Sequence, residues 1–330
     1  MQSSWTEQEI KGAIHGYFEL LDAQENGEPI VKAHIYKRLA EKYPARNAGA
    51  FERKFQNISA VLFEEKLPFA DGLLPYGNYQ NLLKLLVLDH VGRTKRANYS
   101  PRDILSQKIK SLHRRGAIPV KGIGSGRFGL AVEHALGIPP NSDKNADFMG
   151  IEIKTKTDNS LQTLFSRVPS RYIGCADKKE LVEQHGYYDE KRSRQALYTS
   201  FSSKPDTLGF SLSVRNQEIL ISKNGTELLA YQSELLEAAL LSKHSETAYI
   251  KLSLGKSDPN KEQCKIEQFL YGRWPSIIRF MRLISEGKVY LDFTLSINSG
   301  KVRDHGFLWR IVPDAIEKLY LETEVINLSV

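Results

Sequence analysis

The chain has 330 residues, 41% of them hydrophobic, which is enough for one large or two ordinary globular domains with a buried core. Its 46 basic and 39 acidic residues leave a net charge of +7, a modest excess that fits a polyanionic partner without establishing one. No apolar run reaches the roughly 18 residues that a membrane span needs. The start MQSSWTEQEIKG also lacks a secretion-signal pattern, so we expect a cytoplasmic protein with no membrane contact.

The first part of the chain reads as a helical domain. Thr6 followed by Glu9 predicts a capping box at the start of an amphipathic helix that Gly27 ends. Proline, glycine and asparagine signals separate three further helical patterns, at 31–44, 50–68 and 78–91. A polar, basic stretch at 91–103 predicts a linker, which places a boundary near residue 97. We therefore expect a helical domain at 1–97, accessory or DNA-binding in role, and a second domain at 98–330.

The second domain mixes strands and helices. It opens with a helical pattern at 103–115. Strand-like runs follow at 151–157, 207–214, 218–224, 247–254 and 288–297, and helical patterns at 233–243 and 266–284. The alternation predicts an α/β (α+β) domain in layers.

One stretch, NADFMGIEIKTKTDNS at 145–160, places charged residues inside a strand-like run. Alternate strand residues share a face, so Glu152, Lys154 and Lys156 project together, opposite two isoleucines. Gly150 allows a bend that brings Asp147 back toward Glu152. Two converging carboxylates suit Mg²⁺, and a neighbouring ammonium can orient a water or offset charge in a transition state. This set fits metal-assisted phosphodiester hydrolysis.

A solvated edge strand with surface ion pairs is the competing interpretation, and the residues alone favour neither. An acid-x-Lys triplet occurs seven times in the chain, so the triplet has little weight by itself. Only Glu152 among the seven has another acid five residues earlier.

The surrounding sequence, GIGSGRFGLAVEHALGIPPNSDKNADFMGIEIKTKTDNSLQTLF at 122–165, resembles the MutH-like branch of the PD-(D/E)xK nucleases, most closely the MvaI/BcnI-type restriction endonucleases. A helix carrying Glu133, a polar loop, Asp147, a strand with Glu152 and Lys154, and a TLF turn follow in the family's order. The resemblance extends over approximately 120–320. It implies a restriction-endonuclease-like mixed sheet with flanking helices and a DNA cleft. It also implies Asp147 and Glu152 as metal ligands, Lys154 as the catalytic lysine and Glu133 as an accessory acid.

A second motif, RDHGFLWR at 303–310, reads as a loop able to contact bases. Arginine pairs bidentately with guanine in the major groove, so Arg303 and Arg310 are candidates for reading sequence, with His305 beside them. A surface turn with an Asp-Arg pair is the alternative, but in MvaI/BcnI-type enzymes a similar His-Gly segment lies against DNA. Basic residues such as Arg171 and Lys156 suit phosphate contacts.

Together these features predict a sequence-specific type II-like restriction endonuclease. It would use Mg²⁺, with Mn²⁺ or Ca²⁺ able to occupy the same site, to cut double-stranded DNA and leave 5′-phosphate ends. The glycine-rich loop at 122–129 lacks the Lys-Ser/Thr of a nucleotide-binding loop, so no nucleotide cofactor is expected, and the resemblance favours a monomer over a dimer. The alternatives are a MutH-like nicking repair endonuclease, a modification-dependent endonuclease, and a DNA-binding regulator on an inactive nuclease scaffold.

Overall fold

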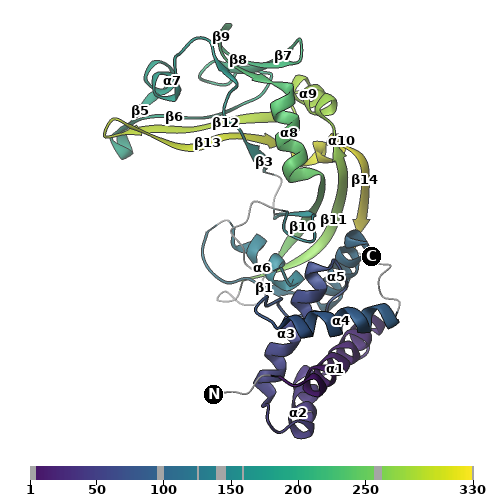
Figure 1. Cartoon of the computed structure of the whole chain (residues 1–330). Coiled ribbons are helices and arrows are strands. Elements are labelled where there is room, and N and C mark those ends of the chain that lie inside the picture. The colour runs from purple at the N-terminus through teal and green to yellow at the C-terminus, as the bar shows by residue number, and fades with distance from the viewer. Residues whose placement is uncertain are drawn as a thin grey trace. The chain divides into compact units, whose positions relative to one another are not determined.

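The computed structural model describes residues 5–94, 100–124, 126–138, 146–157, 160–255 and 262–328 (Figure 1). Two compact units are present. Unit 1 comprises Met1–Thr155, Ile250–Gln268 and Asn327–Val330, and unit 2 comprises Lys156–Tyr249 and Phe269–Ile326. The boundary predicted near residue 97 falls outside the described residues. Helices on both sides of it belong to unit 1.

Unit 1 begins with the predicted helices. α1 (Glu7–Asn26) starts at the expected capping box, in which Thr6 and Glu9 exchange hydrogen bonds, and ends at Gly27 with a φ of 72°. α2 (Lys32–Lys42), α3 (Ala48–Glu64) and α4 (Asn81–Thr94) follow. The predicted apolar face of α1 is buried. Among the described helices, none combines the length and apolar character needed to cross a membrane.

The rest of unit 1 combines two helices with part of a five-stranded sheet. α5 (Pro101–Arg115) is capped by Ser100, and α6 (Arg127–Leu136) ends at Gly137. The strands of the sheet run in the order β1 (Ile118–Pro119), β11 (Gln263–Pro275), β10 (Glu246–Gly255) and β2 (Glu152–Lys156), and β14 (Tyr320–Asn327) pairs with β11. β2, β10, β11 and β14 each contribute residues to both units.

Unit 2 contains two further sheets. One has the order β3 (Gln162–Ser166), β13 (Lys301–Ile311), β12 (Val289–Asn298), β6 (Arg194–Phe201) and β5 (Tyr187–Asp189). The other has the order β4 (Arg171–Tyr172), β9 (Thr226–Gln232), β8 (Glu218–Lys223) and β7 (Phe210–Arg215). The helices are α7 (Lys178–His185), α8 (Ser233–His244), α9 (Ile277–Ser285) and α10 (Ile316–Leu319), with short 3₁₀ turns at Glu190–Arg192 and Pro313–Ala315. Phe210, Phe293 and Trp309 lie in its aromatic core.

The mixed α/β fold and the helical N-terminal region are confirmed, but three local predictions are wrong. The pattern at 266–284 is helical only in α9, because its first part forms β11, in which Ile266, Phe269 and Tyr271 are buried strand residues. The TLF sequence expected as a turn lies in β3, where Leu164 and Phe165 pack into the core. The 303–310 segment expected as a loop lies in β13.

Candidate active site

A tight turn at 147–150 precedes β2. Phe148 and Ile151 form an isolated antiparallel bridge, in which each backbone N–H donates to the other's carbonyl, at 2.9 and 2.8 Å. The two residues between them, Met149 and Gly150, have φ angles of 52° and 98°. Positive φ at both central positions is typical of the hairpin turns whose twist matches that of the flanking strands. The bend predicted at Gly150 is therefore present.

This turn places Asp147 and Glu152 on either side of the Phe148–Ile151 bridge, which reverses the chain between them. One carboxylate oxygen of Asp147 accepts a hydrogen bond from the backbone N–H of Ile153 at 2.9 Å. That bond ties the residue before the turn to the strand after it. The five-residue spacing seen in the sequence is thus the spacing of a short hairpin.

Glu152 and Lys154 project from the same side of β2, as the strand period predicts. The Lys154 ammonium forms an ion pair with the Glu152 carboxylate. Glu152 is only 4% exposed, whereas the Lys154 side chain is 24% exposed. A buried carboxylate on an end strand differs from the solvated edge face of the competing interpretation, because burying a charge is costly unless it is paired or binds a cation.

Glu133 lies on α6, close enough to Asp147, Glu152 and Lys154 for their charges to act on its carboxyl group. Burial raises the pKa of its carboxyl, the charges of Asp147 and Glu152 raise it further, and Lys154 opposes them. A Cβ at Gly129, one turn earlier, would lie 3.4 Å from the Thr155 hydroxyl, which shows how closely α6 approaches β2. The helix neighbour His134 is exposed. Of the two adjacent polar residues, it is Glu133 that faces the acids.

The donor set fits a hard divalent cation with an incomplete protein shell. Within the described ranges, no group of three or more His, Cys, Asp or Glu side chains is arranged to hold a metal ion. Asp147 and Glu152 supply two carboxylates. Mg²⁺ is commonly held by one or two carboxylates together with waters and substrate phosphate oxygens, so such a pair is sufficient in number.

The 303–310 segment lies in the β12–β13 hairpin and contains a β-bulge. Phe293 pairs with Phe307 and Leu295 pairs with Asp304, so β13 has one extra residue here. Gly306 in the bulge has a φ of 108°, and a Cβ there would lie 2.5 Å from the Ser166 hydroxyl. Both the backbone conformation and the available space therefore require glycine at this position.

Hydrogen bonds fix the bulge. Asp304 forms an ion pair with Lys178 of α7 and accepts the N–H of Gly306 at 2.7 Å. The Thr294 hydroxyl donates to the Gly306 carbonyl at 2.6 Å. The exposed side chains of Arg303 and His305 are thus displayed from a fixed backbone.

The other predicted DNA-binding residues have partners within unit 2. Arg310 donates to Asp292 at 2.8 Å and to the Leu161 carbonyl at 2.9 Å. Lys156 donates to the Ser160 hydroxyl at 2.6 Å and to the same Leu161 carbonyl at 3.1 Å. Arg171 pairs with Glu218 at the surface.

Comparison with known proteins identifies the family. The model of the MvaI/BcnI restriction endonuclease family matches residues 106–320. This chain belongs to the MvaI/BcnI restriction endonuclease family. It is therefore a member of a family of DNA-cleaving restriction enzymes, as its sequence predicts. None of the curated proteins searched matches it.

Two solved structures extend the comparison. A structure described as the restriction endonuclease MvaI–cognate DNA substrate complex is 20% identical, with a TM-score of 0.57, and the match covers 68% of this chain and 97% of that one. MvaI in the absence of DNA is 22% identical with a TM-score of 0.44, over 69% of this chain and 98% of that one. The first likeness confirms the restriction-endonuclease-like fold. The MvaI/BcnI family match includes all nine candidate residues and leaves most of the helical region outside it.

Three residues that the sequence did not reveal hold the predicted DNA-contacting residues in place, two from β12 and one from α7. Asp292 holds Arg310, Thr294 holds the bulge, and Lys178 holds Asp304. The alternation in 288–297 contained the signal for two of them, because Asp292 and Thr294 occupy the polar positions of a strand whose other face is buried. Lys178 comes from a distant helix and left no signal.

Proposed function

We propose that the chain is a Mg²⁺-dependent, sequence-specific endonuclease that hydrolyses phosphodiester bonds of double-stranded DNA and leaves 5′-phosphate and 3′-hydroxyl ends. The observation that carries the proposal is the grouping of Glu133, Asp147, Glu152 and Lys154 on a helix, a turn and a strand of one compact unit. Membership of the MvaI/BcnI family supports it. DNA as the partner is supported by the fold likeness to a protein described in complex with cognate DNA.

In this proposal, Asp147 and Glu152 hold the metal ion. When bound, Mg²⁺ (or Mn²⁺) supplies positive charge beside the scissile phosphate and makes a water more acidic, and Ca²⁺ could occupy the same place. Lys154 orients the attacking water and offsets the negative charge that develops on the phosphate. Glu133, whose pKa is raised by burial and by the neighbouring carboxylates, acts as an accessory acid at the edge of the site.

We assign recognition of the DNA base sequence to unit 2. Arg303 and His305 are exposed on the fixed bulge and have the chemistry to contact base edges. Arg310 is oriented by Asp292, and a guanidinium with more than one N–H can keep that bond while contacting DNA. Lys156 and Arg171 contact phosphates. Residues 98–330 form the nuclease domain, residues 1–97 are accessory to it, and the enzyme acts as a monomer.

Sequencing the ends of digested plasmid DNA tests this function. The full chain is incubated with plasmid DNA and Mg²⁺, with EDTA and an Asp147→Ala variant as controls. We expect ends at one recurring sequence, ligatable without added kinase, and no cutting in either control. Cleavage that survives EDTA, or ends that share no sequence, would refute the proposal.

The same assay separates the alternatives. Unmethylated, hemimethylated and modified DNA are digested in parallel. Nicking of hemimethylated DNA alone would indicate a MutH-like repair enzyme, and cutting of modified DNA alone would indicate a modification-dependent nuclease. Binding without any Mg²⁺-dependent cleavage would indicate a regulator on an inactive scaffold.

A further inference from the structure

The loop 65–80 connects α3 to α4, and its residue Phe69 contacts the turn of the candidate active site. Phe69, in this loop, is 3% exposed, and Phe148, the residue after Asp147, is 0% exposed. Their rings stack with centroids 6.2 Å apart at 29°. Phe63 of α3 meets both rings edge-on, at 6.0 Å from Phe148 and 5.8 Å from Phe69. The turn that carries Asp147 is therefore packed against side chains of the helical region.

Phe69 also contacts the helix that carries Glu133. Gly137 ends α6 with a φ of 79°, and a Cβ at this position would lie 2.6 Å from an edge carbon of the Phe69 ring. One aromatic ring thus lies against the turn of Asp147 and against the end of the Glu133 helix.

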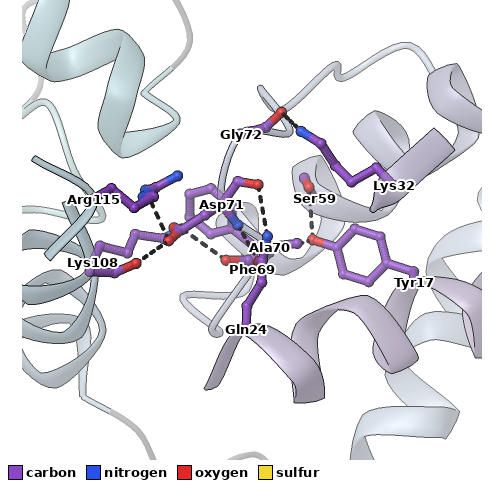
Figure 2. Close-up of polar contacts among 11 residues, drawn as sticks. Tyr17, Gln24, Lys32, Ser59, Phe69, Ala70, Asp71, Gly72, Lys108 and Arg115 are labelled. Carbon is purple, nitrogen blue, oxygen red and sulfur yellow. Dashed lines mark hydrogen bonds and ion pairs between the residues drawn. The ribbon is translucent and has the colours of Figure 1, made fainter. Parts of the chain in front are cut away.

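The loop is itself fixed from the helical side. The Tyr17 hydroxyl accepts the N–H of Ala70 at 2.9 Å and is bonded to the Ser59 hydroxyl at 2.7 Å. Gln24 pairs with the backbone of Asp71 through both atoms of its amide, at 2.8 and 3.2 Å. These bonds join the loop to α1 and α3 (Figure 2).

The loop is also fixed from the side of α5. Figure 2 shows Asp71 facing Lys108 and Arg115, at 3.0 and 3.1 Å. The buried Lys108 ammonium donates to the Phe69 carbonyl at 2.8 Å and lies 3.6 Å from the Phe69 ring centroid. Burial lowers the pKa of Lys108, and the charge of Asp71 opposes this effect. A buried, paired lysine beneath the ring restricts its movement.

We propose that the segment 69–71 is a positioning element, which sets the candidate metal-binding turn and the Glu133 helix in their places through the ring of Phe69. The inference rests on the proposed function, because it takes Asp147 as a metal ligand. It assigns the helical region a part in metal binding, separate from any contact with DNA. Residues that orient metal ligands typically change metal affinity or activity by about 10- to 100-fold when they are replaced.

The test compares full-length Phe69→Leu with Phe51→Leu. Phe51 is equally buried in α3 but packs on Trp5 and Tyr43 instead. Each variant is assayed for thermal stability, metal-free binding to a plasmid fragment that the wild type cuts, Mn²⁺ affinity, and single-turnover cleavage against Mg²⁺ concentration. We expect Phe69→Leu to weaken Mn²⁺ binding and raise the Mg²⁺ midpoint by about tenfold, while DNA binding changes by less than about threefold.

Phe51→Leu should lose comparable thermal stability and keep the wild-type metal midpoint. Equal Mg²⁺ midpoints for Phe69→Leu and Phe51→Leu would overturn the proposal. If Phe69→Leu weakened only DNA binding, the segment would contact DNA and would not position the metal site. Phe63→Leu, at a half-buried position, should shift the midpoint in the same direction and decides the matter if Phe69→Leu does not fold. An Asp147→Asn variant with unchanged Mn²⁺ affinity would instead refute the proposed function.

Discussion

The Lys154 ammonium is paired with the Glu152 carboxylate two residues earlier on β2, and the pair is mostly shielded from solvent. In the proposed function, this arrangement holds Lys154 beside a carboxylate that would bind the metal ion. A charged pair that is partly buried is not favoured for stability alone, since a well-packed apolar pair would often serve as well. The pair therefore fits the proposed catalytic role better than a purely stabilising one.

Replacing Lys154 or Asp147 by alanine should abolish cleavage and leave DNA binding within a few-fold of the wild type. Most of the affinity for DNA comes from phosphate contacts elsewhere, which neither change removes. Single-turnover cleavage and metal-free binding to a labelled fragment measure the two properties. Lys179→Ala, on the exposed face of α7, is the control and should keep both. A parallel loss of binding and cleavage would contradict the roles assigned to these residues.

Glu133→Gln should stabilise the protein near neutral pH. Burial and the charge of Asp147 raise the pKa of Glu133 above its ordinary value of 4.5. A raised pKa means that the contribution of this group to stability is complete below the ordinary value and is lost as the pH rises through the raised one. The neutral glutamine avoids that loss.

The melting temperature of Glu133→Gln in EDTA should exceed that of the wild type at neutral pH, and the gap should close as the pH falls toward 4.5. A gap that is constant with pH would show that Glu133 is not titrating as its surroundings require.

The candidate acids could be found from the sequence because their relationship is local. The two-residue turn at Met149 and Gly150 lies between Asp147 and Glu152, and Gly150 indicates this turn within a stretch of six residues. The packing of Phe69 on Phe148 could not be found in the same way. It joins residues far apart in the sequence, and an aromatic residue in a loop predicts burial without predicting its partner.

The sequence predicted the wrong secondary structure in two segments rich in apolar residues. The 266–284 segment contains the end of β11 followed by α9. The buried residues of its strand part, Ile266, Phe269 and Tyr271, do not keep the strict alternation of a strand. Short apolar runs do not separate strand from helix. In 303–310, charged residues suggested a loop, but Phe307, Trp309 and Ile311 alternate into the core and make the segment a strand.

Arg303→Ala should change which DNA sites are cut. Arg303 is exposed on a backbone that Asp304 and Thr294 hold in place, so its removal should leave the fold intact. Loss of one specific base contact costs about 1–3 kcal/mol of discrimination. Sequencing of plasmid ends should show added or altered sites. Arg282→Ala, which removes an exposed guanidinium on α9, should cut at the wild-type sites with wild-type preference.

Arg46→Ala should strongly destabilise the helical region. Arg46 and Glu9 form an ion pair at 3.0 Å with side chains only 3% and 8% exposed. Removing one partner of a buried pair leaves an uncompensated charge and typically costs about 3–5 kcal/mol. Arg38→Ala breaks the exposed pair with Glu19 instead and should cost less than about 1 kcal/mol. Urea unfolding followed by circular dichroism measures both.

The pH dependence of the Arg46→Ala loss is a further check. Burial alone would raise the pKa of Glu9, but hydrogen bonds from Arg46 and Thr6, together with the charge of Arg46, outweigh it and lower the pKa below 4.5. A lowered pKa contributes stability above the ordinary value, and this contribution is lost as the pH falls through the lowered one. The gap between Arg46→Ala and the wild type should therefore narrow in acid, because a protonated Glu9 no longer needs its partner. A gap that widens below pH 4.5 would rule out Glu9 as the group that Arg46 stabilises.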